Sequence, residues 1–222
     1  MDIPFWHDRW ENNKIGFHLD AANPILAAYW SEVMTDTGVT APRVFVPMAG
    51  KSLDLVWLAD QGCEVVGVEV NERAVNDFFT ELGQQAEVSQ HGELRVCRAG
   101  KITLICGDYF ALQAADIGSI DIVYDRAAFV AMPPDMRQKY ASQLARLCPD
   151  APRLLVTLEY DQAQMAGPPF AVSEEEVLNL YAKGLKTKTL AREDALPDHA
   201  HFAAKGLTSL NECVYYLAPN PD

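Results

Sequence analysis

The sequence lacks the features that mark several classes of protein. None of its windows holds eighteen consecutive apolar residues, so we expect no membrane-spanning helix and no membrane partner. The five cysteines are scattered and none forms a CxxC pair, which argues against a disulfide framework and favours a reducing cytoplasm. Basic residues are scarce, since 18 Lys and Arg face 31 Asp and Glu, and the formal net charge of −13 disfavours binding to nucleic acid.

The amino-terminal segment also lacks the marks of a secretory signal. Residues 1–8 (MDIPFWHD) are acidic and aromatic, with no basic region before an apolar one. The 222 residues are 49% hydrophobic and contain no internal repeat, low-complexity tract or linker, so we predict a single domain over 1–222. A small molecule is the expected partner, and we expect a monomer.

What the sequence does contain is a strand–turn–helix–strand pattern over residues 43–71. Residues 43–47 are a short apolar run rich in β-formers, and 48–51 form the turn. Apolar residues at helical spacing follow over 52–61. Residues 64–70 are continuously apolar, as in a parallel strand covered on both faces. The pattern predicts a βαβ unit that opens a doubly wound α/β sheet.

Glu69 ends the second predicted strand, about twenty residues after the turn, where nucleotide-binding sheets place an acid that accepts hydrogen bonds from ribose hydroxyls. The turn has one glycine, Gly50, whereas a dinucleotide site uses three. Gly50-Lys51-Ser52 ends like a P-loop, but that motif needs a glycine where Phe45 stands. The turn therefore favours an adenosine ligand without pyrophosphate, such as S-adenosylmethionine. A βαβ unit without a ligand stays open.

The residues before the sheet predict two helices. Residues 5–11 form a short amphipathic helix with the exposed-looking Trp6 and Trp10 on one face. A second helix runs from about Asn23 to Met34. One interpretation is that this segment covers the carboxyl edge of the sheet as a lid. The alternative is that the tryptophans only pack into the core.

The middle of the chain predicts a loop over residues 84–92 and a hairpin of strands at 94–98 and 102–106. The second strand leads into Gly107 and Asp108, where an acid suits the adenine amino group. Simple turn chemistry is the alternative for this pair.

Residues 120–126 predict another buried strand, followed by a helical turn over 127–131. Its last residue, Arg126, stands where open α/β sheets bind ligands. The alternative is a pair with Asp125 that caps the strand, although adjacent residues point to opposite faces. Later segments predict a capping box at Ser173 and three more strands, at 153–159, 185–190 and 212–217, of which the last two form an antiparallel pair.

Four segments, in order, resemble the thiopurine S-methyltransferase family and its bacterial members: FWHDRW…IGFH, VFVPMAGKSLDLVWLADQG…VVGVEV, IDIVYDRAAFVAMPP and EYDQAQMAGPPF. The resemblance spans residues 5–217. It implies the class I S-adenosylmethionine-dependent methyltransferase fold, a three-layer αβα Rossmann-like core over 41–222. The sheet would be mostly parallel with an antiparallel carboxyl-terminal strand, and 1–40 would be the lid. The implied cofactor is S-adenosylmethionine, and the implied acceptor is an aromatic or heterocyclic thiol such as 6-mercaptopurine.

The resemblance also implies site residues, and no metal is expected among them. Members carry a second cation near the acceptor, but no arginine within 198–205 aligns with it. His199 and His201 in that stretch are of a type that binds metal, yet such loop pairs are usually solvated. The implied acceptor residues are Phe17 and Arg126, and the implied cofactor residues are Trp10, Met48 (where leucine is usual), Glu69, Gly107, Asp108 and Arg126.

The implied chemistry needs few catalytic groups. Methyl transfer from a sulfonium is an in-line displacement whose leaving thioether needs no proton, so catalysis is mainly positioning. Arg126 would stabilise an ionised acceptor, and no general base or covalent nucleophile is predicted. Two alternatives remain: the same scaffold methylating selenium or tellurium oxyanions or other small thiols, and a non-catalytic protein that retains the cofactor.

Overall fold

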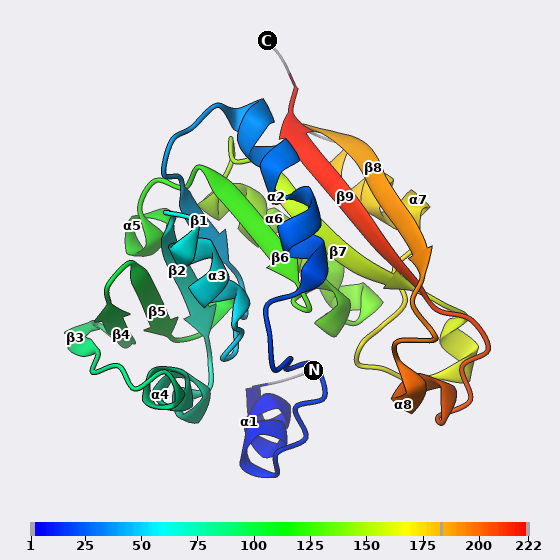
Figure 1. Cartoon of the computed structure of the whole chain (residues 1–222), viewed down its shortest axis with the longest axis horizontal. Helices are drawn as coiled ribbons and strands as arrows, with labels where there is room; N and C mark the ends of the chain where they lie inside the picture. The colour runs from blue at the N-terminus through cyan, green and yellow to red at the C-terminus, as the bar shows by residue number, and fades with distance from the viewer. Residues whose placement is uncertain (1–2, 183, 221–222) are drawn as a thin grey trace. The chain divides into compact units, whose positions relative to one another are not determined.

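The computed structural model describes residues 3–182 and 184–220 (Figure 1). These residues form two compact units that meet between Val123 and Tyr124 in the sequence. The boundary falls inside strand β6 (Ile122–Arg126). Both units are built from strands and helices, as predicted for an α/β protein. The single domain expected over 1–222 stays a prediction. Within the described residues, no helix combines the length and apolar character that crossing a membrane requires.

The centre of the first unit is parallel sheet. The strand order is β3-β4-β5-β2-β1-β6, and β1 pairs in parallel with both β2 and β6, while β2 pairs in parallel with β5. These pairings confirm the βαβ unit predicted from residues 43–71. The bounds are β1 (Arg43–Val46), β2 (Glu64–Glu69) and β5 (Ile102–Cys106).

The prediction of a loop over residues 84–92 is wrong, because this segment contains strand β3 (Glu87–His91). β3 pairs antiparallel with β4 (Leu94–Ala99), which in turn pairs antiparallel with β5, as the predicted hairpin requires. All five residues of β3 are exposed. An edge strand exposed on both faces carries no alternation of apolar and polar residues, so only its backbone pairing defines it.

Helices α3 and α4 pack on β2 and β5. Helix α2 is capped at its start by Asn23, whose side chain accepts a hydrogen bond from the Ile25 N–H. At its end it is capped by Gly38, whose φ of 61° lies in the left-handed region. Both ends agree with the sequence prediction. The bounds are α1 (Ile3–Glu11), α2 (Pro24–Thr37), α3 (Asp54–Asp60), α4 (Glu72–Glu81), η1 (Tyr109–Ala111) and α5 (Ala114–Ile117).

Strand β2 is buried along nearly its whole length, which explains its apolar sequence. Its Gly67 pairs with Leu104 in the neighbouring strand. A Cβ at position 67 would lie 2.6 Å from Leu104 Cδ2 and 3.0 Å from the Ala49 Cβ. The close approach of β2, β5 and the turn after β1 therefore leaves no room for a side chain there.

The second unit contains antiparallel strands. Its order is β6-β7-β9-β8, and β9 pairs antiparallel with both β7 and β8. This confirms the predicted antiparallel carboxyl-terminal strand. The bounds are β7 (Arg153–Glu159), β8 (Leu185–Asp194) and β9 (Asn211–Pro219), with α6 (Pro134–Leu147), α7 (Glu174–Tyr181), α8 (Ala200–Ala203) and η3 (Gln162–Gln164).

The helical turn predicted over residues 127–131 is shorter than expected. Ala127 has a φ of 65°, and the chain forms a 3-10 turn only at η2 (Phe129–Ala131). A left-handed residue interrupts the helical hydrogen-bonding pattern, so β6 and η2 are joined by a sharp turn.

A buried arginine connects loops of the second unit through hydrogen bonds and an ion pair. Arg137 of α6 donates to the carbonyl oxygens of Met132, at 3.0 Å, and Ala171, at 2.8 Å, and pairs with Glu176 of α7. The predicted cap is present, since Ser173 Oγ accepts from the Glu176 N–H at 3.2 Å. The Glu176 carboxylate, however, faces Arg137. One guanidinium thus joins three segments of the chain.

Candidate functional site

Glu69 lies at the end of β2 with its side chain almost fully buried. One carboxylate oxygen accepts a hydrogen bond from the Gly50 N–H at 3.0 Å, and the other accepts from the Asn71 N–H at 2.8 Å. Burial raises the pKa of this carboxyl to about 7, against the opposing effect of the backbone N–H groups of Asn71, Gly50 and Val70. Each oxygen has a second lone pair, so the carboxylate retains capacity for further donors such as hydroxyl groups.

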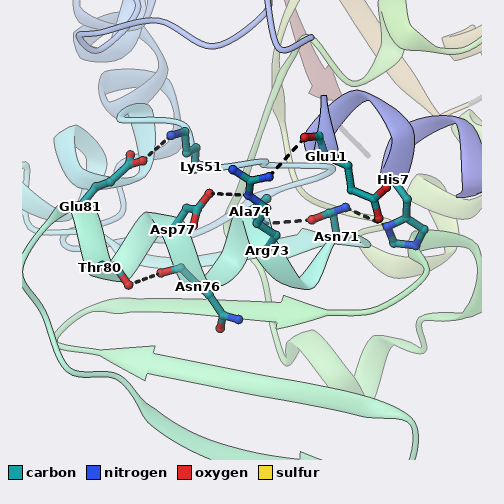
Figure 2. A network of polar contacts seen from close by, with 10 residues as sticks. All are labelled: His7, Glu11, Lys51, Asn71, Arg73, Ala74, Asn76, Asp77, Thr80 and Glu81. Atoms are coloured by element: carbon teal, nitrogen blue, oxygen red, sulfur yellow. Dashed lines mark hydrogen bonds and ion pairs between the residues drawn. The ribbon is translucent and has the colours of Figure 1, made fainter. Parts of the chain in front are cut away.

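The turn between β1 and α3 is shaped to meet Glu69. Met48 and Gly50 both have left-handed φ angles, of 47° and 55°, which turn the chain sharply after β1. The next residue, Lys51, pairs with Glu81 at the end of α4 (Figure 2). A phosphate-binding lysine would instead be directed at a ligand, so this contact argues against the P-loop interpretation.

Trp10 covers this turn. A Cβ at position 50 would lie 3.1 Å from the Trp10 ring, so the indole occupies the space beside Gly50. Trp10 is 4% exposed, which corrects the expectation of two exposed tryptophans; Trp6 is half-buried. The ring of Phe17 packs edge-on against both indoles, at 5.7 Å from Trp10 and 6.1 Å from Trp6. The amino-terminal segment therefore packs on the glycine turn; its movement as a lid stays a prediction.

Two polar contacts join α1 to α4 (Figure 2). His7 Nδ1 lies 2.8 Å from Asn71 Nδ2, and Arg73 Nη1 donates to the Glu11 carbonyl oxygen at 3.4 Å. Asn71 also caps α4, since its side-chain oxygen accepts from the Ala74 N–H at 3.1 Å, and sequence reasoning missed His7. No local signal marked His7, because its partner lies 64 residues away in the sequence.

Gly107 and Asp108 follow β5 next to Glu69. The Gly107 N–H donates to the Glu69 carbonyl oxygen at 3.0 Å. The Asp108 side chain accepts from the Phe110 N–H at 2.9 Å and caps η1, as the turn interpretation expected. A role for Asp108 toward adenine stays a prediction. The first unit thus brings together six predicted site residues: Trp10, Phe17, Met48, Glu69, Gly107 and Asp108.

In the second unit, Asp125 and Arg126 have different surroundings. Asp125 is buried and accepts hydrogen bonds from Tyr140 Oη at 2.7 Å and from the Phe129 N–H at 3.1 Å, and burial raises the pKa of its carboxyl to about 6. Arg126 is partly exposed. Burial raises the pKa of Glu212 and the positive charge of Arg126 opposes that shift, so the guanidinium lies within electrostatic range of this carboxylate.

His199 and His201 lie at α8, with ring centroids 5.7 Å apart. Burial is the main cause that lowers the pKa of both imidazoles, and the charge of Arg126 lowers that of His199 further. Across residues 3–182 and 184–220, no three His, Cys, Asp or Glu side chains form a group suited to a metal ion.

Known proteins resemble this chain in both structure and sequence. A SAM-dependent methyltransferase from Anabaena variabilis superimposes with a TM-score of 0.65 at 14% identity, over 99% of this chain and 96% of its own. A Burkholderia thailandensis 1,6-didemethyltoxoflavin-N1-methyltransferase, solved with S-adenosylhomocysteine, gives 0.61 at 14% identity, over 97% and 86%. At such identity the likeness concerns the fold, which is that of class I methyltransferases.

The sequence relatives are much closer. A thiopurine S-methyltransferase from Pseudomonas aeruginosa is 49% identical over 218 residues, covering 98% of this chain and 99% of the relative. One from Methylococcus capsulatus is 45% identical over 219 residues, covering 98% and 97%. The model of the family described as thiopurine S-methyltransferase matches residues 1–220. On these grounds the chain belongs to the thiopurine S-methyltransferase family.

Proposed function

We propose that this protein is a thiopurine S-methyltransferase, which transfers the methyl group of S-adenosylmethionine to an aromatic or heterocyclic thiol. The observation that carries the proposal is the family match over residues 1–220, with relatives of that name at up to 49% identity. The arrangement around Glu69 supports it independently, since a carboxylate with open lone pairs suits hydroxyl donors and a turn with one glycine suits a ligand without a pyrophosphate.

The residues of the first unit fit S-adenosylmethionine. Glu69 binds the ribose hydroxyls through the lone pairs that Gly50 and Asn71 leave open. Trp10 and Met48 supply apolar surface beside the turn, and a methionine in place of the usual leucine preserves volume and apolar character. Gly107 and Asp108 take the adenine side. When bound, the cofactor supplies the methyl group as a sulfonium.

Arg126 is the side chain we assign to the acceptor. A thiol is most nucleophilic as its thiolate, and a guanidinium beside the sulfur stabilises the ionised form. The transfer then needs alignment of the nucleophile with the methyl carbon, and no general base. Phe17 offers its ring to the acceptor's aromatic ring, in line with its contacts to Trp6 and Trp10.

A methyl-transfer assay tests the proposal. Labelled S-adenosylmethionine is incubated with 6-mercaptopurine, thiophenol, selenite or tellurite, and the labelled product is identified. The proposal expects S-methylated 6-mercaptopurine and thiophenol, with a large loss of rate in Arg126→Ala. Tight binding of S-adenosylhomocysteine without transfer to any of the four acceptors would establish a non-catalytic binding protein instead. Transfer only to selenite or tellurite would establish the chalcogen alternative.

We further propose that the protein acts as a monomer in the cytoplasm, without nucleic acid. All five cysteines are free and four of them are buried, which suits a reducing compartment. The acidic net charge opposes association with nucleic acid. Light scattering coupled to gel filtration measures the mass of the purified protein, for which we expect the monomer's 24.6 kDa.

A further inference from the structure

We propose that His7 and Asn71 are positioning residues that couple the docking of helix α1 to cofactor binding at Glu69. Neither residue was assigned a role at the site from the sequence. The proposal rests on the proposed function, in that it takes Glu69 as the ribose-binding group. It adds that the docking of α1 and the affinity of Glu69 for its ligand depend on each other, and that Asn71 links the two.

Asn71 uses three polar groups in three directions. Its backbone N–H donates to Glu69 at 2.8 Å, and its side-chain oxygen accepts from the Ala74 N–H at 3.1 Å to cap α4. The side-chain nitrogen then faces His7 Nδ1 at 2.8 Å (Figure 2). Because the cap fixes which end of the amide is oxygen, the nitrogen must be the donor to His7.

This geometry determines the state of the histidine. If Asn71 Nδ2 donates, His7 Nδ1 must accept, so the imidazole is neutral and carries its proton on Nε2. Asn71 is 4% exposed with α1 docked, so a side chain at position 7 that cannot accept would leave its N–H buried and unpaired. Such a change therefore weakens the docked arrangement next to Glu69.

The docked helix presents one continuous face to the site. His7 and Glu11 are one turn apart, and the Glu11 carbonyl receives the Arg73 guanidinium at 3.4 Å. Trp10, on the adjoining part of the same helix, covers Gly50, whose N–H is the second donor to Glu69. Gly50 and Asn71, whose N–H groups donate to the Glu69 carboxylate, thus both lie against side chains of α1.

The consequence is a reciprocal coupling. A ligand that engages Glu69 stabilises the arrangement of Gly50 and Asn71 to which α1 docks, and a docked α1 raises affinity for that ligand by the same factor. Losing one hydrogen bond to a buried donor corresponds to about a tenfold change in affinity.

The test compares His7→Leu with His7→Gln, whose side-chain oxygen can accept the bond from Asn71. His91→Leu is the matched control, since His91 lies on the exposed edge strand β3. We expect S-adenosylhomocysteine to bind about tenfold more weakly to His7→Leu and within about threefold of wild type to His7→Gln and His91→Leu. We also expect the ligand to protect α1 from protease in the wild type and less so in His7→Leu.

Two results would overturn the coupling: unchanged affinity in His7→Leu, or a loss in His7→Gln equal to that in His7→Leu, which would indicate packing rather than a hydrogen bond. Nitrogen NMR of the imidazole adds an independent readout, because a proton found on Nδ1 would exclude the proposed bond. The proposed function is tested separately by the methyl-transfer assay, and the role of Glu69 by its own variant. If Glu69→Gln binds S-adenosylhomocysteine like wild type, Glu69 is not the ribose ligand, whatever the tautomer of His7.

Discussion

Cofactor binding should release a proton from Glu69. Burial holds the pKa of this carboxyl at about 7 in the free protein, so about half of the molecules carry a proton there at pH 7. Ribose hydroxyls donate to the carboxylate and favour its ionised form. Binding therefore lowers the pKa and expels about half a proton at pH 7, and nearly one at pH 6.

The same shift sets how affinity depends on pH. The pKa in the free protein is raised, so the proton must leave before the ligand binds, and affinity rises with pH up to the region of pH 7. The ionised fraction grows from about a tenth at pH 6 to about nine tenths at pH 8, which predicts an approximately tenfold gain in affinity.

Calorimetric titration with S-adenosylhomocysteine in buffers of different ionisation enthalpy counts the released protons. Glu69→Gln is the control, because it removes the titrating group, retains one acceptor oxygen and leaves the ligand's own titration in place. An equal proton count for wild type and Glu69→Gln would refute the reasoning. Glu69→Ala is a poorer probe, since it also deprives the Gly50 and Asn71 N–H groups of their acceptor.

Three further predictions concern the second unit. Asp125→Asn should flatten the pH dependence of unfolding. The raised pKa of Asp125 lowers the free energy of unfolding of the wild type by about 2 kcal/mol as pH rises from about 4 to about 6, and urea titrations at both pH values measure the difference. Arg137→Ala should lower the free energy of unfolding by about 3 kcal/mol. This is the lower end of the range for breaking a buried ion pair, because the partner Glu176 is partly exposed. Glu176→Gln should lower the free energy of unfolding by less in the same urea titration. Arg126→Lys should reduce kcat/KM more for thiols of high pKa than for thiols already ionised at neutral pH, and an equal loss for every acceptor would assign Arg126 to the cofactor alone.

The central sheet was predictable because its strands are buried on both faces. Burial on both faces leaves continuous apolar runs such as that of β2, and the glycine turn at Gly50 separates strand from helix. Helix ends were predictable for the same local reason, since Asn23 and Gly38 act within their own helix. Signals of this kind lie within a few residues of the element that they define.

Features that depend on distant residues were not predictable. His7 and Asn71 are separated by 64 residues, and nothing in either segment marks the other as its partner. Asp54 is buried and accepts a hydrogen bond from the Asn23 N–H at 2.6 Å, a contact between residues 31 positions apart that no local pattern indicates. Strand β3 has no buried side chain, so its sequence carried no periodicity to recognise.

The crowding at Gly67 has a consequence for sequence variation. Position 67 faces Leu104 so closely that even a methyl group at 67 would overlap the Leu104 side chain. Gly67→Ala alone should therefore destabilise the protein, while Gly67→Ala with Leu104→Ala should recover part of the loss. Among relatives, the two positions should covary in volume: a chain with alanine at 67 needs a smaller residue at 104. The packing of β2 against β5 would then be detectable as a correlation between the residue volumes at positions 67 and 104 in an alignment.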